Sequence, residues 1–144
     1  AIPSRVESFT LFKEHNPKGV VLVPRNPKRN RYGKTPYVKY DSARWPFLFK
    51  GNYNSPVRAL ARVVAVGAEA WPLSLIKKKK TIEHNGLLLT WKAGQNSALD
   101  TRFIKRGKDI GNVVVTRNGK DVVHHIPFAF AFKAFYPEGT IHTE

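Results

Sequence analysis

The amino-acid sequence predicts an α+β domain with two roughly four-stranded antiparallel sheets and two helices, in an arrangement of the type ββββα repeated. Short runs rich in β-branched and aromatic residues recur along the chain, and turn-forming residues separate them. One apolar stripe with helical spacing lies near the middle of the chain, and a second candidate helix lies near its end. The length of 144 residues and the 42% hydrophobic content fit a single domain over residues 1–144.

The first half of the chain is expected to hold four strands. Residues 8–13 and 19–23 form a strand pair around an Asn-Pro-Lys-Gly turn. Residues 24–36 are rich in Pro, Asn, Gly and basic side chains, which predicts a long exposed basic loop. Residues 37–41 and 47–50 are then expected to be the third and fourth strands.

The clearest predicted helix covers residues 56–71. Asn54 and Ser55 supply an N-cap, Pro56 takes the first helical position, and Pro72 ends the segment. Apolar residues at three- and four-residue spacing form one stripe, which comprises Val57, Leu60, Ala61, Val64, Ala68 and Trp71. Gly67 weakens a helix interior by about 1 kcal/mol relative to alanine, so packing of this stripe is expected to hold the helix.

The second half is expected to contain further strands and turns. Asn118-Gly119 is the strongest hairpin signal in the chain, because a type I′ turn needs positive φ at both central residues. The expected strands are residues 73–81, 87–92, 99–106, 113–117 and 120–126, with turns at Asn85-Gly86 and at residues 94–96. Residues 127–136 fit either a strand or a helix begun by Pro127, and periodicity does not decide between them.

Charge is the strongest functional signal in the sequence. The chain has 25 Lys and Arg against 10 Asp and Glu, a formal net charge of +15. Residues 25–50 hold eight basic and one acidic side chain, and residues 73–108 hold nine and two, whereas residues 109–144 hold three and four. A localised excess of this size indicates a polyanionic partner, and nucleic acid is the first choice.

A sheet that carries Lys and Arg on several neighbouring strands would present a grid of charges to a phosphate backbone. The basic residues expected to contact phosphates are Lys39, Arg44, Lys50, Lys77, Lys79, Lys92, Arg102, Lys105 and Arg106. The four consecutive lysines from Lys77 to Lys80 fit a phosphate-binding strand or an edge guarded against aggregation about equally well. The aromatic residues that interleave with the basic ones and are candidates for base stacking are Tyr37, Tyr40 and Trp91.

No pattern in the sequence nominates an enzyme, a cofactor or a metal centre. Cysteine is absent, and no motif of hydrolases, zinc proteases or nucleotide-binding loops occurs. His124 and His125 would point to opposite faces of a strand, which disfavours joint metal ligation. No apolar run reaches the 18 residues of a membrane-spanning helix, so we expect no membrane partner.

The order of elements, the basic strands and the Phe-rich end resemble the Whirly-type fold, and within it the kinetoplastid mitochondrial guide-RNA-binding proteins. Residues 47–71 (FLFKGNYNSPVRALARVVAVGAEAW) correspond to a last strand plus first helix, and residues 111–136 to a last hairpin plus second helix. The resemblance implies a heterotetramer with a paralogous subunit, in which sheet faces hold guide RNA and pre-mRNA by their phosphates. It also implies RNA annealing during RNA editing, and a mitochondrial location.

Two other functions stay open at this point. A small basic structural protein of a ribosome or nucleocapsid would use residues 24–36 as an RNA-threading extension. An enzyme that acts on nucleic acid would need a residue such as His84 acting with Glu83. We expect neither catalysis nor a bound cofactor.

Overall fold

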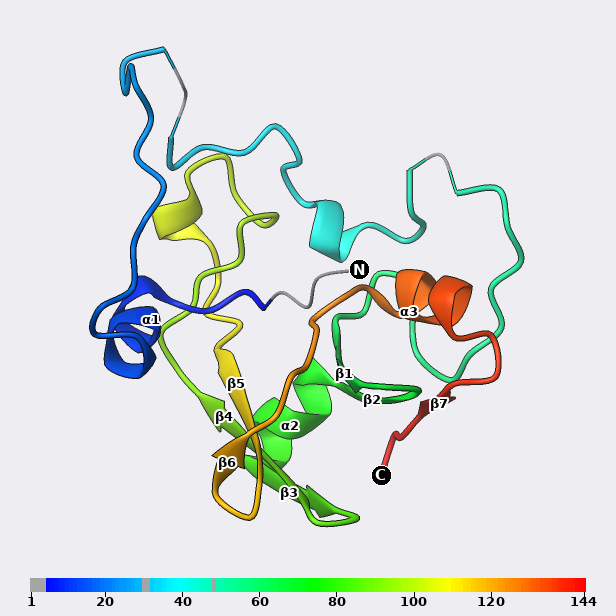
Figure 1. Ribbon diagram of the computed structural model, residues 1–144. Coiled ribbons are helices and arrows are strands. Elements are labelled where there is room, and N and C mark those ends of the chain that lie inside the picture. The colour runs from blue at the N-terminus through cyan, green and yellow to red at the C-terminus, as the bar shows by residue number, and fades with distance from the viewer. Residues whose placement is uncertain (1–4, 30–31, 48) are drawn as a thin grey trace.

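The computed structural model describes residues 5–29, 32–47 and 49–144, and it has an α+β architecture with two sheets (Figure 1). In chain order the elements are α1 (Phe9–His15), η1 (Tyr40–Ser42), β1 (Val63–Val66), β2 (Glu69–Pro72), α2 (Leu73–Lys79), β3 (Thr81–His84), β4 (Leu87–Lys92), η2 (Ile104–Arg106), β5 (Asn112–Arg117), β6 (Lys120–Asp121), α3 (Ala129–Phe135) and β7 (Thr140–Ile141). The predicted α+β class with two sheets is confirmed. The predicted repeat of four strands and a helix is wrong, because this element order does not contain it.

The larger sheet has the strand order β3-β4-β5-β6, and all its neighbouring pairs are antiparallel. The smaller sheet has the order β1-β2-β7, in which β2 and β7 are parallel. The helix α2 connects the two sheets directly, since it begins where β2 ends (Figure 1). No helix in the described part of the chain is long and apolar enough to cross a membrane.

The helix predicted over residues 56–71 is wrong, because β1 and β2 form a hairpin there. Gly67 has φ +58, which makes it a turn residue and not the interior of a helix. Alternate residues of β1 face two different apolar clusters: Val64 packs toward the larger sheet, and Val63 and Ala65 pack toward α3. A strand that is buried on both faces has apolar residues at successive positions. Such a run also contains apolar residues at three- and four-residue spacing, so it matches the pattern of a helix.

The strand predicted over residues 73–81 is wrong as well, because residues 73–79 form α2. Leu73 and Ile76 are buried at a spacing of one helical turn, and the lysines that follow are exposed. A strand would have turned half of the four consecutive lysines toward the core, whereas the helix leaves all of them in water. The chain leaves the helix at Lys80, where φ is +68.

The remaining predicted strands of the first half are also absent. Residues 8–13 belong largely to α1, whose first turn is capped by the Ser8 hydroxyl, which accepts a bond from the Leu11 N–H. Residues 19–23 are extended but pair with no strand in the described part of the chain, and residues 37–41 lead into η1. Residues 47–50 form no strand among those described, with Leu48 outside the described residues. These runs have strand-like composition but lack a partner that would complete a ladder.

The two Asn-Gly turns and the strands β4 and β5 agree with the sequence predictions. The Asn85-Gly86 and Asn118-Gly119 turns both have positive φ at both residues and connect β3 to β4 and β5 to β6. The strand predicted over residues 87–92 is confirmed as β4, and the one over 113–117 as most of β5. The strand predicted over residues 120–126 is shorter than expected and forms only β6. The strand predicted over residues 99–106 is wrong, because a loop with η2 lies there. Residues 127–136, which fit either a strand or a helix, contain the helix α3.

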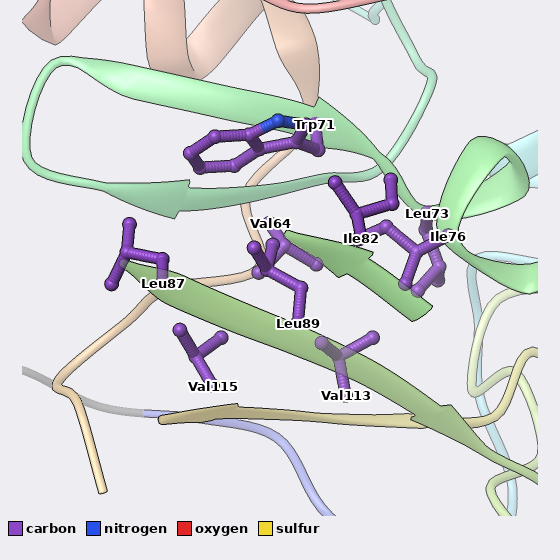
Figure 2. Packing of buried hydrophobic residues seen from close by; sticks show 9 residues of the cluster. All are labelled: Val64, Trp71, Leu73, Ile76, Ile82, Leu87, Leu89, Val113 and Val115. Carbon is purple, nitrogen blue, oxygen red and sulfur yellow. The ribbon is translucent and has the colours of Figure 1, made fainter. Parts of the chain in front are cut away.

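The main core lies between the larger sheet, α2 and the hairpin of β1 and β2. Its buried side chains are Val64, Trp71, Leu73, Ile76, Ile82, Leu87, Leu89, Val113 and Val115 (Figure 2). The Trp71 indole extends over the inward side chains of β4 and β5 (Figure 2). A smaller cluster on the other face of the β1–β2 hairpin includes Phe132 of α3. The hairpin therefore separates two apolar clusters and fixes α2 and α3 on opposite sides of itself.

Leu89 and Leu88 are adjacent on β4 but face opposite sides of the sheet. Leu89 is 0% exposed and Leu88 is 36% exposed. We expect Leu89→Ala to lower the free energy of unfolding by about 2–5 kcal/mol, because it opens a cavity in the main core. Leu88→Ala removes the same atoms from a more exposed position, so it should lower the free energy of unfolding by less than about 1 kcal/mol. Urea denaturation of both variants tests the assignment, and equal losses would contradict it.

Candidate nucleic-acid interface

The two basic blocks of the sequence meet on one long loop, residues 94–111, which we call the hub loop. Its middle runs antiparallel to the stretch that begins at Gly33. The Ile104 N–H donates to the Gly33 carbonyl (3.0 Å) at one end, and the Lys39 N–H donates to the Asp100 carbonyl (2.9 Å) at the other. Backbone pairing therefore places cations from far-apart parts of the chain side by side.

An aromatic ring organises the first group of cations, which we call the Phe103 cluster: Lys34, Arg102, Phe103 and Arg106. The Lys34 ammonium and the Arg106 guanidinium each lie 5.4 Å from the centre of the Phe103 ring. Phe103 and the three basic side chains are all exposed. Arg102 and Lys34 also line a shallow hollow on this surface. Two cations thus lie against one exposed ring, and Arg102 is the residue directly before it in the sequence.

A second group, the Trp91 cluster, lies where α2 approaches β4. The Lys80 and Lys77 ammonium groups are 4.2 and 5.3 Å from the centre of the Trp91 ring. The indole N–H donates to the Ile110 carbonyl of the hub loop (2.9 Å), and Gly111 lies so close to the ring that any side chain there would collide with it. The ring is therefore fixed in place beneath two lysines.

Lys108 and Lys77 connect these two groups through the hub loop. The Lys108 ammonium is 3.6 Å from the carboxylate of Asp41 and 3.4 Å from the Ser42 hydroxyl. Asp41 is buried, and it also accepts a 2.6 Å hydrogen bond from the Ser97 hydroxyl. The Lys77 ammonium donates to the carbonyl of residue 109 (2.8 Å). Lys108 thus joins the hub loop to the first basic block, and Lys77 joins it to α2, while both ammonium groups stay exposed.

A hollow of about 500 Å³ opens beside Lys77 and Lys108. Arg58 and Arg62 enter it from the segment before β1, and both were missed by the sequence predictions. The Arg62 guanidinium lies 5.0 Å from the centre of the Phe128 ring, and its Nε has no hydrogen-bond partner among the described residues. Burial lowers the pKa of Arg62 from its ordinary value, and this is partly opposed by Asp41. Arg62 is half-buried beside other cations, and a guanidinium in such a position is suited to an anionic oxygen.

All nine basic residues expected to contact phosphates are exposed. They do not form the predicted grid on a sheet face, because they lie on loops, on α2, in η2 and at the end of β4. The pairs between strands place Glu83 opposite Leu88, Leu88 opposite Thr116, and Thr116 opposite Asp121, so this face of the larger sheet carries no lysine or arginine at these positions. Lys34 and Lys80, like the two arginines of the hollow, were not among the predicted contacts.

The three aromatic residues expected to stack on bases differ in their surroundings. The Tyr40 ring packs edge-on against Phe128, with 5.7 Å between ring centres, whereas the Tyr37 ring is 61% exposed. Trp91 is already covered by lysines, as described above. Tyr37 is therefore the aromatic residue of the three with the most freely accessible ring.

One carboxylate closes the hub loop. Asp109 accepts hydrogen bonds from the backbone N–H groups of Gly94 (2.9 Å), Gln95 (3.2 Å) and Gly111 (2.8 Å). These bonds, with that from Gly94 contributing most, together with the charge of Lys77, hold the pKa of Asp109 below its ordinary value although partial burial opposes this. The two ends of the loop are therefore joined through a single ionised side chain.

Asp109→Asn should lower the free energy of unfolding by about 1–3 kcal/mol at neutral pH, because it removes a charged acceptor from three N–H donors. The pKa of Asp109 is lowered in the folded state, so its stabilising effect is fully present above the ordinary pKa of 3.8 and is lost as the pH falls through the folded value. The difference between wild type and variant should therefore shrink in strong acid. Urea denaturation at neutral and acidic pH measures this, with exposed Glu138→Gln as a neutral control. A difference that is independent of pH would contradict the assignment.

The chain matches one protein family over nearly its whole length. Searches of curated proteins and of solved structures found no match. The model of the family described as "Protein of unknown function (DUF3179)" matches residues 1–139. With 139 of its 144 residues inside the match, the chain belongs to the DUF3179 family.

Proposed function

We propose that this protein binds single-stranded RNA by its phosphate backbone along the hub loop, from the Phe103 cluster to the Trp91 cluster. The observation that carries the proposal is the pairing of the two basic blocks of the sequence across this loop. RNA is preferred to other polyanions because exposed aromatic rings lie among the cations, where bases can stack.

Most of the positive charge on this surface has no carboxylate partner among the described residues. Among lysines and arginines in the described ranges, only Arg5 and Lys108 have a carboxylate oxygen within 4.0 Å. The formal net charge of +15 therefore repels itself in the free protein. Each phosphate that binds relieves this repulsion and releases condensed counterions from the RNA, so a polyanion is a favourable ligand without any sequence-specific contact.

The hollow beside α2 provides a point at which one phosphate can be held more firmly. Arg58, Arg62, Lys77 and Lys108 all line it. Guanidinium groups bind phosphate oxygens through paired hydrogen bonds, whereas a lysine contributes a point charge. This hollow would fix the position of the strand, and the exposed clusters would extend the contact on either side.

We also propose, from the resemblance alone, that the RNA is guide RNA and its pre-mRNA in mitochondrial RNA editing, and that a paralogous subunit takes part. Neutralising phosphates lowers the repulsion between complementary strands, so annealing requires neither a catalytic residue nor ATP. If the bases that do not stack on these rings face outward from the hub loop, complementary RNAs should anneal faster in the presence of the protein.

A second candidate is a structural role in a ribonucleoprotein particle, which is favoured by residues 19–29. This segment extends away from both sheets and exposes apolar side chains, with Leu22 98% exposed (Figure 1). Such a segment would thread between RNA helices and order on binding. Removing its charges with Arg25→Gln, Lys28→Gln and Arg29→Gln would abolish RNA binding in this case, but would only weaken it if the hub loop is the main contact.

RNA affinity should fall steeply with salt, because binding releases counterions. For a single strand the slope of log K against log salt is about −0.7 per phosphate contact, so six contacts predict a slope of about −4. Fluorescence anisotropy with a labelled single-stranded RNA measures this slope. An affinity almost independent of salt would overturn the proposal, and equal affinity for single-stranded DNA would widen it to nucleic acid in general.

The double variant Arg102→Gln/Arg106→Gln removes two charges from the Phe103 cluster. It should weaken RNA binding and make the salt slope shallower by about 1.4, since each lost phosphate contact contributes about 0.7. Arg117→Gln/Lys120→Gln removes the same charge from the turn between β5 and β6, far from the hub loop (Figure 1). This control should leave the slope unchanged. An equal effect of both pairs would mean that only net charge matters.

A further inference from the structure

Three side chains with metal-binding chemistry gather outside the basic surface. Glu69 lies at the start of β2, His84 at the end of β3, and His142 directly after β7. The Glu69 Oε1 atom is 3.0 Å from His84 Nε2 and 3.2 Å from His142 Nε2. One ligand atom from each of the three residues lies within 4.8 Å of the others, and all three side chains are partly exposed.

The backbone around the cluster holds the three side chains in place. The parallel pairing of β2 with β7 sets Glu69 opposite Thr140, and the His142 N–H donates to the Ala70 carbonyl (2.9 Å). His84 is the last residue of β3 before a tight type I′-like turn. Strand ends therefore position Glu69 and His84, and a backbone hydrogen bond to β2 positions His142.

Trp71 fixes the two imidazole rings. Its indole is 1% exposed and is stacked on the His142 ring, with 4.9 Å between centres and 17° between planes. It meets the His84 ring edge-on at 5.3 Å. The centres of the two imidazole rings are 4.5 Å apart. The indole belongs to the main core (Figure 2), so the ring orientations are tied to the most rigid part of the fold.

Hydrogen bonding within the cluster does not satisfy His84. Its Nε2 lies 3.0 Å from Glu69 Oε1, which requires a proton on the nitrogen, and 3.1 Å from Asn85 Nδ2, which requires a lone pair. A ring nitrogen offers one or the other. A cation between the rings and the carboxylate would take the place of the proton that Glu69 requires, because both Nε2 lone pairs and the carboxylate oxygen would then point at the same positive charge. The exposed Asn85 amide would then turn to water.

We propose that Glu69, His84 and His142 bind a divalent first-row metal ion, with Zn²⁺ as the best fit. Two imidazoles and one carboxylate are a ligand set that proteins use for zinc, at metal–ligand distances of about 2.0–2.2 Å. Two atoms at about 2.1 Å from one ion are about 3.0 Å apart at a right angle and about 3.4 Å apart at a tetrahedral angle, a range that includes both separations from Glu69 Oε1. Three protein ligands leave at least one coordination position for water or an exogenous ligand, on the exposed side of the cluster.

Isothermal titration of the metal-free protein with Zn²⁺, and with Co²⁺ read by its absorption in the visible range, tests the proposal. We expect one ion per chain and a Co²⁺ spectrum of low coordination number. His142→Gln and Glu69→Gln should each weaken binding by about 100-fold or more. His15→Gln is the matched control, because His15 also faces a glutamate, Glu7, at 3.7 Å but lies outside the cluster.

Circular dichroism shows whether each variant is folded, and Zn²⁺ should raise the unfolding temperature of the wild type and of His15→Gln only. Wild-type binding that is absent, or that persists in both His142→Gln and Glu69→Gln, would overturn the site. The RNA affinity of the folded variants should be unchanged, because the cluster shares no residue with the hub loop or the hollow. Loss of the metal site and loss of RNA binding are therefore separate outcomes.

Discussion

The pairing of the hub loop with the stretch from Gly33 to Lys39 is the constraint on which the basic surface depends. These backbone hydrogen bonds hold the first basic block against the second. Without them the first block would be a long loop with few contacts, and its charges would have no fixed position relative to those of the second block. Asp109 closes the loop at its ends, and Lys108 fixes it to the buried Asp41 carboxylate. Two carboxylates thus help to position a much larger number of cations, and the surface keeps most of its positive charge.

The apolar core and the basic surface are connected through a few side chains. Trp91 packs against the main core on one side and carries two lysines on the other, and α2 buries Leu73 and Ile76 while it exposes its last turn. The hollow with Arg62 lies where α2 meets the segment before β1. The same helix therefore contributes to packing and presents charge, which explains how a small chain sustains an exposed surface of one sign. The Glu69, His84 and His142 cluster lies away from this helix, where the two histidine rings contact Trp71.

The parts of this structure that local chemistry decides are visible in the sequence, and the parts that depend on distant partners are not. The Asn-Gly turns were predicted because positive φ is a property of two adjacent residues. The residues of the β1–β2 hairpin match a helical pattern because alternate side chains face two apolar clusters, and only the folded chain shows the second cluster. The charge of the site follows from composition, whereas its position follows from loop pairing. Glu69, His84 and His142 have no motif spacing, so only the sheet topology brings them together.

Lysine footprinting would show whether RNA covers the hub loop and the stretch that pairs with it. Acetylation of exposed lysines, read by mass spectrometry with and without a saturating single-stranded RNA, reports which ammonium groups the RNA covers. Binding along the hub loop predicts joint protection of Lys34, Lys77 and Lys80, with Lys120 still reactive at the turn between β5 and β6. Protection that is spread evenly over all lysines, or that includes Lys120 but not Lys34 and Lys80, would contradict a single surface built from the two basic blocks.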